Sequence, residues 1–149
     1  MRIAIGSDHA GFELKGLLIP MLKEMGHEPI DVGAYVLDED DDYPDFAIAV
    51  ANMVRKGEAE RGIVICGTGI GSSIAANKVK GIRAALCHDT LTARLSREHN
   101  DANVLALGGR IIGKELAMEI VRVWLGSDFL EGRHKRRLDK IREIEEVGG

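Results

Sequence analysis

A short apolar run over residues 62–65 leads directly into the glycine-rich stretch 66–73, CGTGIGSS, and a helical pattern follows over 72–79. This order predicts a buried strand, a tight turn and the start of a helix. It places the thiol of Cys66 at the carboxyl end of the strand, beside the free backbone N–H groups of the turn. Helix N-termini and loop amides attract anions and stabilise thiolates. The junction therefore indicates chemistry at this point as well as binding.

Strand-like and helix-like segments alternate along the whole chain. We expect strands at 3–7, 28–32, 63–66, 82–87 and 103–107, and helices at 9–25, 43–56, 72–79, 89–98, 113–125 and 134–146. Pro20 is expected to interrupt the first helix, and Asp89 to cap the fourth. Alternation of this kind predicts a Rossmann-like three-layer α/β/α sandwich, with a five-stranded parallel sheet and an extra C-terminal helix.

Length and composition limit the kind of protein. The 149 residues are expected to form a single domain over 1–149, long enough to bury a real core. Three Phe, two Tyr and one Trp, with a net charge of −4, argue against a nucleic-acid partner. No apolar stretch approaches the ~20 residues of a membrane span. With two cysteines and no signal-peptide pattern, a reduced, cytoplasmic protein is expected.

Ligands of such folds bind outside the carboxyl ends of the strands. The residues expected at that edge are Ser7, Asp8 and His9, then Cys66 to Ser72, then Cys87, His88 and Asp89, and finally Gly108, Gly109 and Arg110. A cysteine in a strand is often an inert core residue, and Cys87 lacks a glycine-rich loop. We therefore expect a structural role for Cys87 and a functional one for Cys66. Asp8 could also serve only as a helix cap.

The glycine-rich turn does not match the common nucleotide-binding patterns. Its spacing is G-x-G-x-G, whereas the dinucleotide fingerprint needs G-x-G-x-x-G, and no Gly-Lys-Ser/Thr follows. A purely structural turn is the alternative interpretation. The neighbouring Cys66, Thr68 and Ser72 favour a functional one.

Two charged stretches and one histidine have competing interpretations. Residues 38–42, DEDDD, predict a solvated loop, with a cation site as the alternative. Arg133 and Arg137 are four residues apart, so they share a helix face that suits a phosphate monoester as well as solvent. His99, near a helix C-terminus, suits proton transfer to sugar oxygens or a simple interaction with the helix dipole.

The motifs occur in the order GSDHAG (6–11), DYPD (42–45), CGTGIGS (66–72), AANK (75–78), GIRA (81–84), SREHND (96–101) and GRH (132–134), followed by Arg137. As a set they resemble the type B ribose-5-phosphate isomerases, of the family that includes the galactose-6-phosphate isomerase subunits. The resemblance runs the whole length of the chain. It implies interconversion of ribose 5-phosphate and ribulose 5-phosphate through an enediolate, with no cofactor and no metal.

The resemblance also implies roles for individual residues. A cysteine at the position of Cys66 is the base that moves a proton between C1 and C2, whereas some members use a glutamate where Ser72 stands here. Residues 67–71 would form the anion hole, and Thr68 and His99 would assist ring opening. The residues expected to bind substrate are Asp8, His9, Tyr43, Gly67, Gly69, Ile70, Gly71, Ser72, Asn100, Arg110, Arg133 and Arg137.

Helix geometry adds an expectation about assembly. A helix over 89–98 is roughly 15 Å long and runs away from the carboxyl edge of the sheet. His99 should therefore lie far from Cys66 of its own chain. If both serve one site, His99 comes from a second subunit, which predicts a homodimer with two composite sites. The alternative functions are an isomerase of a six-carbon 6-phosphate, such as allose or galactose 6-phosphate, and a non-catalytic sugar-phosphate sensor.

Overall fold

Five parallel strands form one sheet, in the order β2-β1-β3-β5-β4, in this computed structural model, which describes residues 1–148. The strands are β1 (Arg2–Ser7), β2 (Glu28–Asp31), β3 (Arg61–Cys66), β4 (Ala84–Leu86) and β5 (Val104–Gly108). Ser7 is in register with Ile65, and Cys66 with Gly108. The carboxyl ends of the three central strands therefore meet at one edge, as the sequence predicts.

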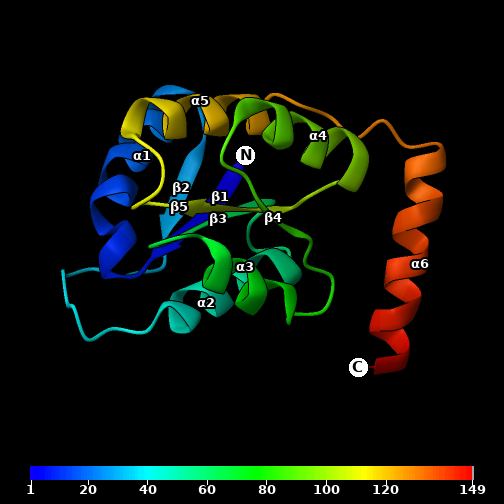
Figure 1. The fold of residues 1–149 in the computed structure, drawn as a ribbon, viewed down its shortest axis with the longest axis horizontal. Coiled ribbons are helices and arrows are strands. Elements are labelled where there is room, and N and C mark those ends of the chain that lie inside the picture. Colours follow the sequence, from blue (N-terminus) through cyan, green and yellow to red (C-terminus); the bar gives the residue numbers. More distant parts are fainter. Residues whose placement is uncertain (149) are drawn as a thin grey trace.

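Helices cover both faces of the sheet (Figure 1). The helices α1 (Phe12–Glu24), α4 (Thr90–Asn100) and α5 (Lys114–Leu125) lie over one face, and α2 (Tyr43–Arg55) and α3 (Ile70–Asn77) over the other. A short 3-10 turn, η1 (His9–Gly11), joins β1 to α1. The last helix, α6 (Arg133–Gly148), extends beyond the β4 side of the molecule. The predicted three-layer sandwich with an extra C-terminal helix is confirmed.

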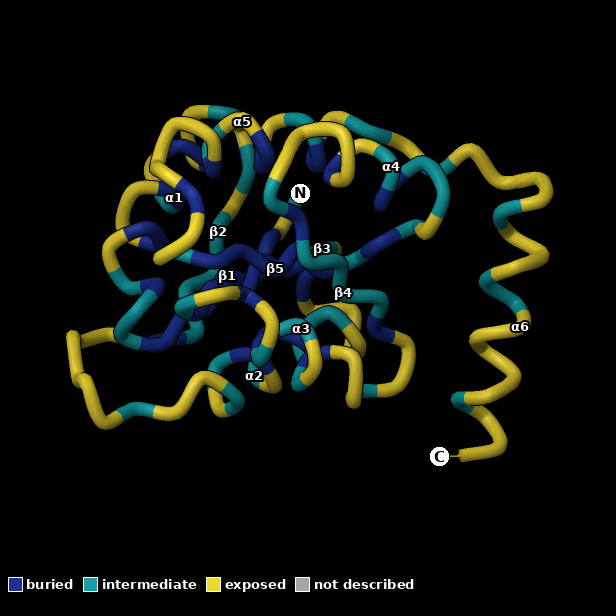
Figure 2. Tube along the Cα trace, viewed as in Figure 1, coloured by how far each residue is buried: buried dark blue, intermediate teal, exposed yellow. Residues whose placement is uncertain are grey.

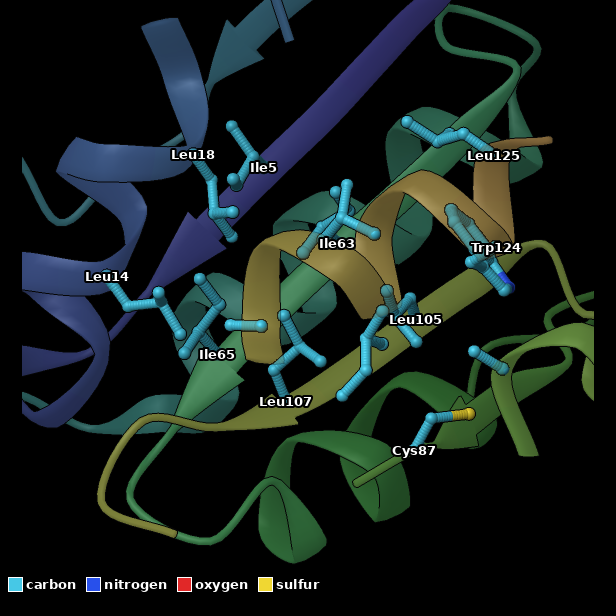
Figure 3. Packing of buried hydrophobic residues seen from close by; sticks show 14 of the residues in the cluster. Ile5, Leu14, Leu18, Ile63, Ile65, Cys87, Leu105, Leu107, Trp124 and Leu125 are labelled. Atoms are coloured by element: carbon cyan, nitrogen blue, oxygen red, sulfur yellow. The ribbon is translucent and has the colours of Figure 1, made fainter. Parts of the chain in front are cut away.

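The two faces of the sheet pack differently because side chains alternate along each strand. Large residues such as Ile63 and Leu105 meet Leu18 and Trp124 on the α1 and α5 side (Figure 3). The other face carries smaller residues, Ala4, Val64 and Ala106. A Cβ on Gly62 would lie 2.4 Å from a methyl carbon of Val50 in α2. The small face therefore lets α2 pack closely against the sheet.

The element boundaries correct two of the expectations. Helix α1 runs through Pro20 without a break. Pro20 and Gly16 are both exposed, so water can solvate the Gly16 carbonyl that a proline nitrogen leaves without a partner. Helix α3 begins at Ile70, earlier than expected, because the turn before it is tighter. The cap at Asp89 is confirmed, since its side chain accepts a hydrogen bond from the Thr92 N–H at 2.6 Å.

Helix α6 differs from helices α1 to α5 in its exposure (Figure 2). None of its described residues is buried. It is attached through contacts with α4, which include the stacked rings of His99 and His134, and through the Glu145 carboxylate, which accepts a hydrogen bond from the Gly81 N–H at 3.2 Å. Over residues 1–148, no helix combines the length and apolar character that crossing a membrane requires.

Candidate active site

The turn after β3 wraps around the thiol of Cys66. This side chain is 4% exposed, and the backbone N–H of Gly69 donates a hydrogen bond to its Sγ at 3.2 Å. Gly69 adopts φ +79°, a left-handed conformation that favours glycine, and it forms the N-cap of α3. The N–H of Ile70 donates to Thr68 Oγ1 at 3.2 Å. A donor aimed at the sulfur stabilises negative charge there, so the turn suits a thiolate.

Packing against β5 fixes the shape of this turn. A Cβ on Gly69 would lie 2.5 Å from the Leu86 side chain and 2.9 Å from the backbone of Leu107. The N–H of Gly109 donates to the Cys66 carbonyl at 2.8 Å, and the N–H of Arg110 donates to the Gly67 carbonyl at 2.9 Å. The amides beside Cys66 are therefore held in place by the core before any ligand arrives.

A hollow of about 440 Å³ opens above the thiol. It is lined by Asp8, Tyr43, Cys66, Gly67, Thr68, Ile70, Gly71 and Ile74. Tyr43 packs directly on Gly71, where a Cβ would lie 2.4 Å from the ring. The Asp8 carboxylate is buried and accepts the Gly11 N–H at 3.1 Å. A carboxylate, a phenol, a hydroxyl and a thiol thus face one space, which suits a polyhydroxylated ligand.

Three further candidates lie at the margin of this hollow. The side chain of Arg110 approaches Gly67, with its Cδ and Nη1 each 3.6 Å from the Cβ position of that glycine. Ser72 is buried within α3. His9 opens the 3-10 turn η1, directly after Asp8.

His9 has a partner that the sequence did not single out. Asp41 Oδ1 lies 2.7 Å from His9 Nδ1 and accepts the backbone N–H of the same histidine at 3.0 Å. This hydrogen bond raises the pKa of His9 above its ordinary value, opposing the effect of desolvation. Donor atoms of Asp8, His9 and Asp41 lie within 4.8 Å of one another, but the ring nitrogen nearest Asp41 is engaged by its carboxylate. The arrangement is that of a hydrogen-bonded ion pair.

The remaining candidates gather elsewhere, at the junction of α4 and α6. His99 and Asn100 end α4, and Arg133 and Arg137 lie in the first turns of α6. The rings of His99 and His134 stack, with centroids 4.3 Å apart and planes 12° from parallel. Within residues 1–148, none of these side chains lines the hollow above Cys66.

The two groups are far apart within one chain. Helix α4 ends only a few residues before Val104, at the start of β5, whereas Cys66 is paired with Gly108 at its end. The strand alone separates these points by roughly 13 Å. Figure 1 also shows α6 at the opposite end of the molecule from the loop between β2 and α2, which carries Asp41. The separation of His99 from Cys66 that helix geometry predicts is present.

These features define an α/β protein with a buried thiol, hydrogen-bonded by a loop amide, at the carboxyl edge of its sheet. A family model described as Ribose/Galactose Isomerase matches residues 3–141. The chain therefore belongs to the ribose/galactose isomerase family, and the resemblance drawn from its motifs is confirmed.

Relatives match the chain over nearly its whole length. The ribose-5-phosphate isomerase B of Escherichia coli (strain K12) is 51% identical, with 97% of each chain covered. A solved structure of Clostridium thermocellum ribose-5-phosphate isomerase B is 56% identical, with a TM-score of 0.98 and 100% of both chains covered. The Mycoplasma genitalium ribose-5-phosphate isomerase B, solved with bound ribulose-5-phosphate, is 45% identical, has a TM-score of 0.95 and covers 97% of this chain and 96% of its own.

Proposed function

We propose that this chain is an aldose–ketose isomerase that interconverts ribose 5-phosphate and ribulose 5-phosphate. The observation that carries the proposal is the thiol of Cys66, held by the Gly69 N–H on the floor of a hollow lined by polar groups. The substrate follows from the relatives named ribose-5-phosphate isomerase B, one of them with ribulose-5-phosphate bound. We expect the enzyme to need no metal or cofactor and to act in the cytoplasm.

In this proposal the Cys66 thiolate is the base. It removes the proton from C2 of open-chain ribose 5-phosphate, and the electron pair moves through C1 onto the carbonyl oxygen. The amides of residues 67–71 stabilise the resulting enediolate. Return of the proton to C1, with transfer of the hydroxyl proton from O2 to O1, gives ribulose 5-phosphate and restores the thiolate. No atom is gained or lost.

The other candidates receive supporting roles. Thr68 and His99 assist opening of the furanose ring by moving its protons. Asp8, Tyr43 and Asn100 bind hydroxyls, and Gly67, Gly69, Ile70, Gly71 and Ser72 shape the anion hole. The phosphate is held by His9, Arg110, Arg133 and Arg137, since guanidinium groups match its geometry.

This assignment requires a homodimer with shared sites. One chain keeps Cys66 about a strand length or more from His99 and the arginines of α6. A second copy can supply them if its α6 lies across the hollow of the first. Exposed apolar side chains occur at both places: Ile70 and Ile74 beside the hollow, and Ile141, Ile144 and Val147 on α6. Burying such surfaces is what stabilises protein association.

The first experiment measures ketose formation from ribose 5-phosphate in the presence of EDTA. Wild-type protein should turn over, and Cys66→Ala should lose activity by about a hundredfold to ten-thousandfold, the usual contribution of a general base, while keeping its fold. Cys87→Ala is the matched control, because it removes the other thiol, which lies in the core between the sheet and the layer of α1, α4 and α5. An active Cys66→Ala variant would remove the thiol from its role.

The same assay separates the alternatives. Turnover of allose or galactose 6-phosphate in preference to ribose 5-phosphate would move the assignment to a six-carbon substrate. Saturable binding of these phosphates without turnover would indicate a sensor.

A further inference from the structure

Asp41 differs from the acidic residues around it. Residues 38–42 are all acidic, and four of them are exposed, whereas the Asp41 side chain is only 11% exposed. A turn selects it: Asp38 accepts the Asp40 N–H with its side chain and the Asp41 N–H with its carbonyl. The fold thus buries most of one carboxylate of an acidic segment whose other members are exposed to solvent.

This carboxylate holds a single residue at two points. Its Oδ1 meets both Nδ1 and the backbone N–H of His9, which lies 32 positions earlier in the chain. Two contacts from one oxygen fix the imidazole relative to its own backbone. With Nδ1 facing a carboxylate, the proton of that nitrogen is committed, and Nε2 is the nitrogen left for a ligand.

The beginning of the same loop is tied down separately. Lys15 is buried in α1 and donates to the Asp31 carboxylate and to the carbonyl of Ala34. The exposed residues 35–40 lie between this anchor and Asp41. Because Lys15 already secures the start of the loop, the contact at Asp41 is not needed to attach the loop as a whole.

The charges around His9 favour its protonated form. The hydrogen bond to Asp41 is the largest influence raising its pKa, and the negative charges of Asp8 and Asp41 raise it further. Desolvation and the positive charge of Arg110 act in the opposite direction. A charged His9 beside Arg110, close to the amides of the glycine turn, makes this side of the hollow suited to an anion.

We propose that Asp41 is a positioning residue that presents the Nε2–H of His9 to the phosphate of the substrate. The proposal rests on the proposed function, since it assigns the anion bound there to a sugar phosphate. Asp41 acts through His9 and does not touch substrate. In this arrangement its carboxylate plays the part that a carboxylate often plays behind a functional histidine, fixing the orientation of the ring and favouring its protonated form, in which Nε2 also carries a proton.

The decisive variant is Asp41→Asn, which preserves size and removes the charge. We expect KM for ribose 5-phosphate to rise about tenfold with little change in kcat. Without Asp41, His9 loses its proton at lower pH, so the alkaline limb of kcat/KM should move to lower pH. Asp41→Glu should restore part of the effect. Asp40→Asn is the matched control, because it removes the same charge from the same loop without touching His9.

Titration of the histidine rings by NMR provides a readout that does not need catalysis. His9→Asn identifies the His9 signal, and the midpoint of that signal should fall in Asp41→Asn but not in Asp40→Asn. Inorganic phosphate, used as the probe, should perturb His9 in wild type and do so more weakly in Asp41→Asn. An inactive enzyme that shows these shifts would sink the isomerase assignment but keep the role of Asp41. Equal effects of the two loop variants, or an unchanged His9 midpoint, would overturn the proposal.

Discussion

The turn around Cys66 and the helix α6 represent opposite ways of holding functional side chains. The turn is packed on β5, and the carbonyls of Cys66 and Gly67 accept hydrogen bonds from the N–H groups of Gly109 and Arg110. Helix α6 has no buried residue among those described, and its exposed apolar side chains reach 74% for Ile144 and 91% for Val147. One half of the proposed site is therefore organised by the core of its own chain, and the other half is displayed on the surface.

This difference explains why one chain contains both groups of site residues, those around Cys66 and those at α6, although the two groups do not meet within that chain. Most of the stability of helices in proteins comes from packing of an apolar face, and α6, which is 16 residues long, buries none of its described residues. An apolar stripe with nothing to cover it adds no stability. Both deficits disappear if α6 packs on a second copy, so the same contact would order the helix and complete the partner's site.

Removing α6 should have the largest effect. A chain that stops after Leu130 keeps every buried core residue, so it should still unfold cooperatively. Its activity should fall by about a thousandfold, because the arginines that we propose to hold the phosphate are gone. Circular dichroism and the ketose assay measure the two outcomes. The Arg133→Ala/Arg137→Ala double variant, which keeps the helix, should be almost as inactive. A truncated chain that keeps a tenth of wild-type activity would contradict the proposal that α6 supplies part of the site.

Mixing two inactive variants tests whether the halves come from different chains. Cys66→Ala and His99→Asn should each be inactive alone. After unfolding and refolding together they should regain about a quarter of wild-type activity, since half of the dimers are mixed and one of their two sites is intact. If each site belonged to a single chain, no intact site could form and the mixture would stay inactive. Sedimentation at the assay concentration checks that dimers are present.

Local patterns in the sequence were sufficient for most of the framework. The strands around Ile63 and Leu105 are apolar runs, and the glycine spacing predicts the turn at Cys66, because these features depend on residues close together in the chain. Helix length alone predicts that His99 lies away from Cys66. In each case the physical determinant is a periodicity or a rise per residue.

Contacts made by side chains from distant segments could not be predicted in this way. Five consecutive acidic residues look equivalent in the sequence, and only the folded turn at Asp38 singles out Asp41 for His9. The stack of His99 on His134 depends on how α6 leaves the body of the molecule. Such pairings are fixed by tertiary packing, which leaves no periodic signal along the chain.

A smaller effect on activity is expected from adding one methyl group to the part of the proposed site around Cys66. In Gly71→Ala the new Cβ would meet the Tyr43 ring at 2.4 Å, and Tyr43 is exposed enough to swing away. Activity should fall about tenfold through loss of a hydroxyl contact, with about 1 kcal/mol or less of destabilisation. Gly16→Ala is the control, since nothing lies within 4 Å of its Cβ position and the residue is in a helix. It should stabilise the protein by up to about 1 kcal/mol and leave kinetics unchanged.

The smallest expected effect is the dependence of the stability of α6 on pH. Partial burial, then the neighbouring His99, Arg133 and Arg137, lower the pKa of His134 from its ordinary value of 6.5. The neutral ring is therefore favoured in the folded state. The stability it contributes is complete above pH 6.5 and is lost as the pH falls through the lowered pKa.

Protection of the first amides of α6 from hydrogen exchange, corrected for intrinsic rates, should accordingly decrease by a few-fold between pH 7.5 and 5.5. His134→Phe keeps a stacking ring without a titratable nitrogen, so its protection should vary less with pH. His27→Phe is the matched control, because His27 also has a lowered pKa but lies beside the N-terminus, where it contacts the terminal amine. If His134→Phe and wild type lose protection equally, the pH response of α6 arises elsewhere. A response confined to α6, with the turn at Cys66 unchanged over the same range, would show that the two halves of the site differ in stability as well as in position.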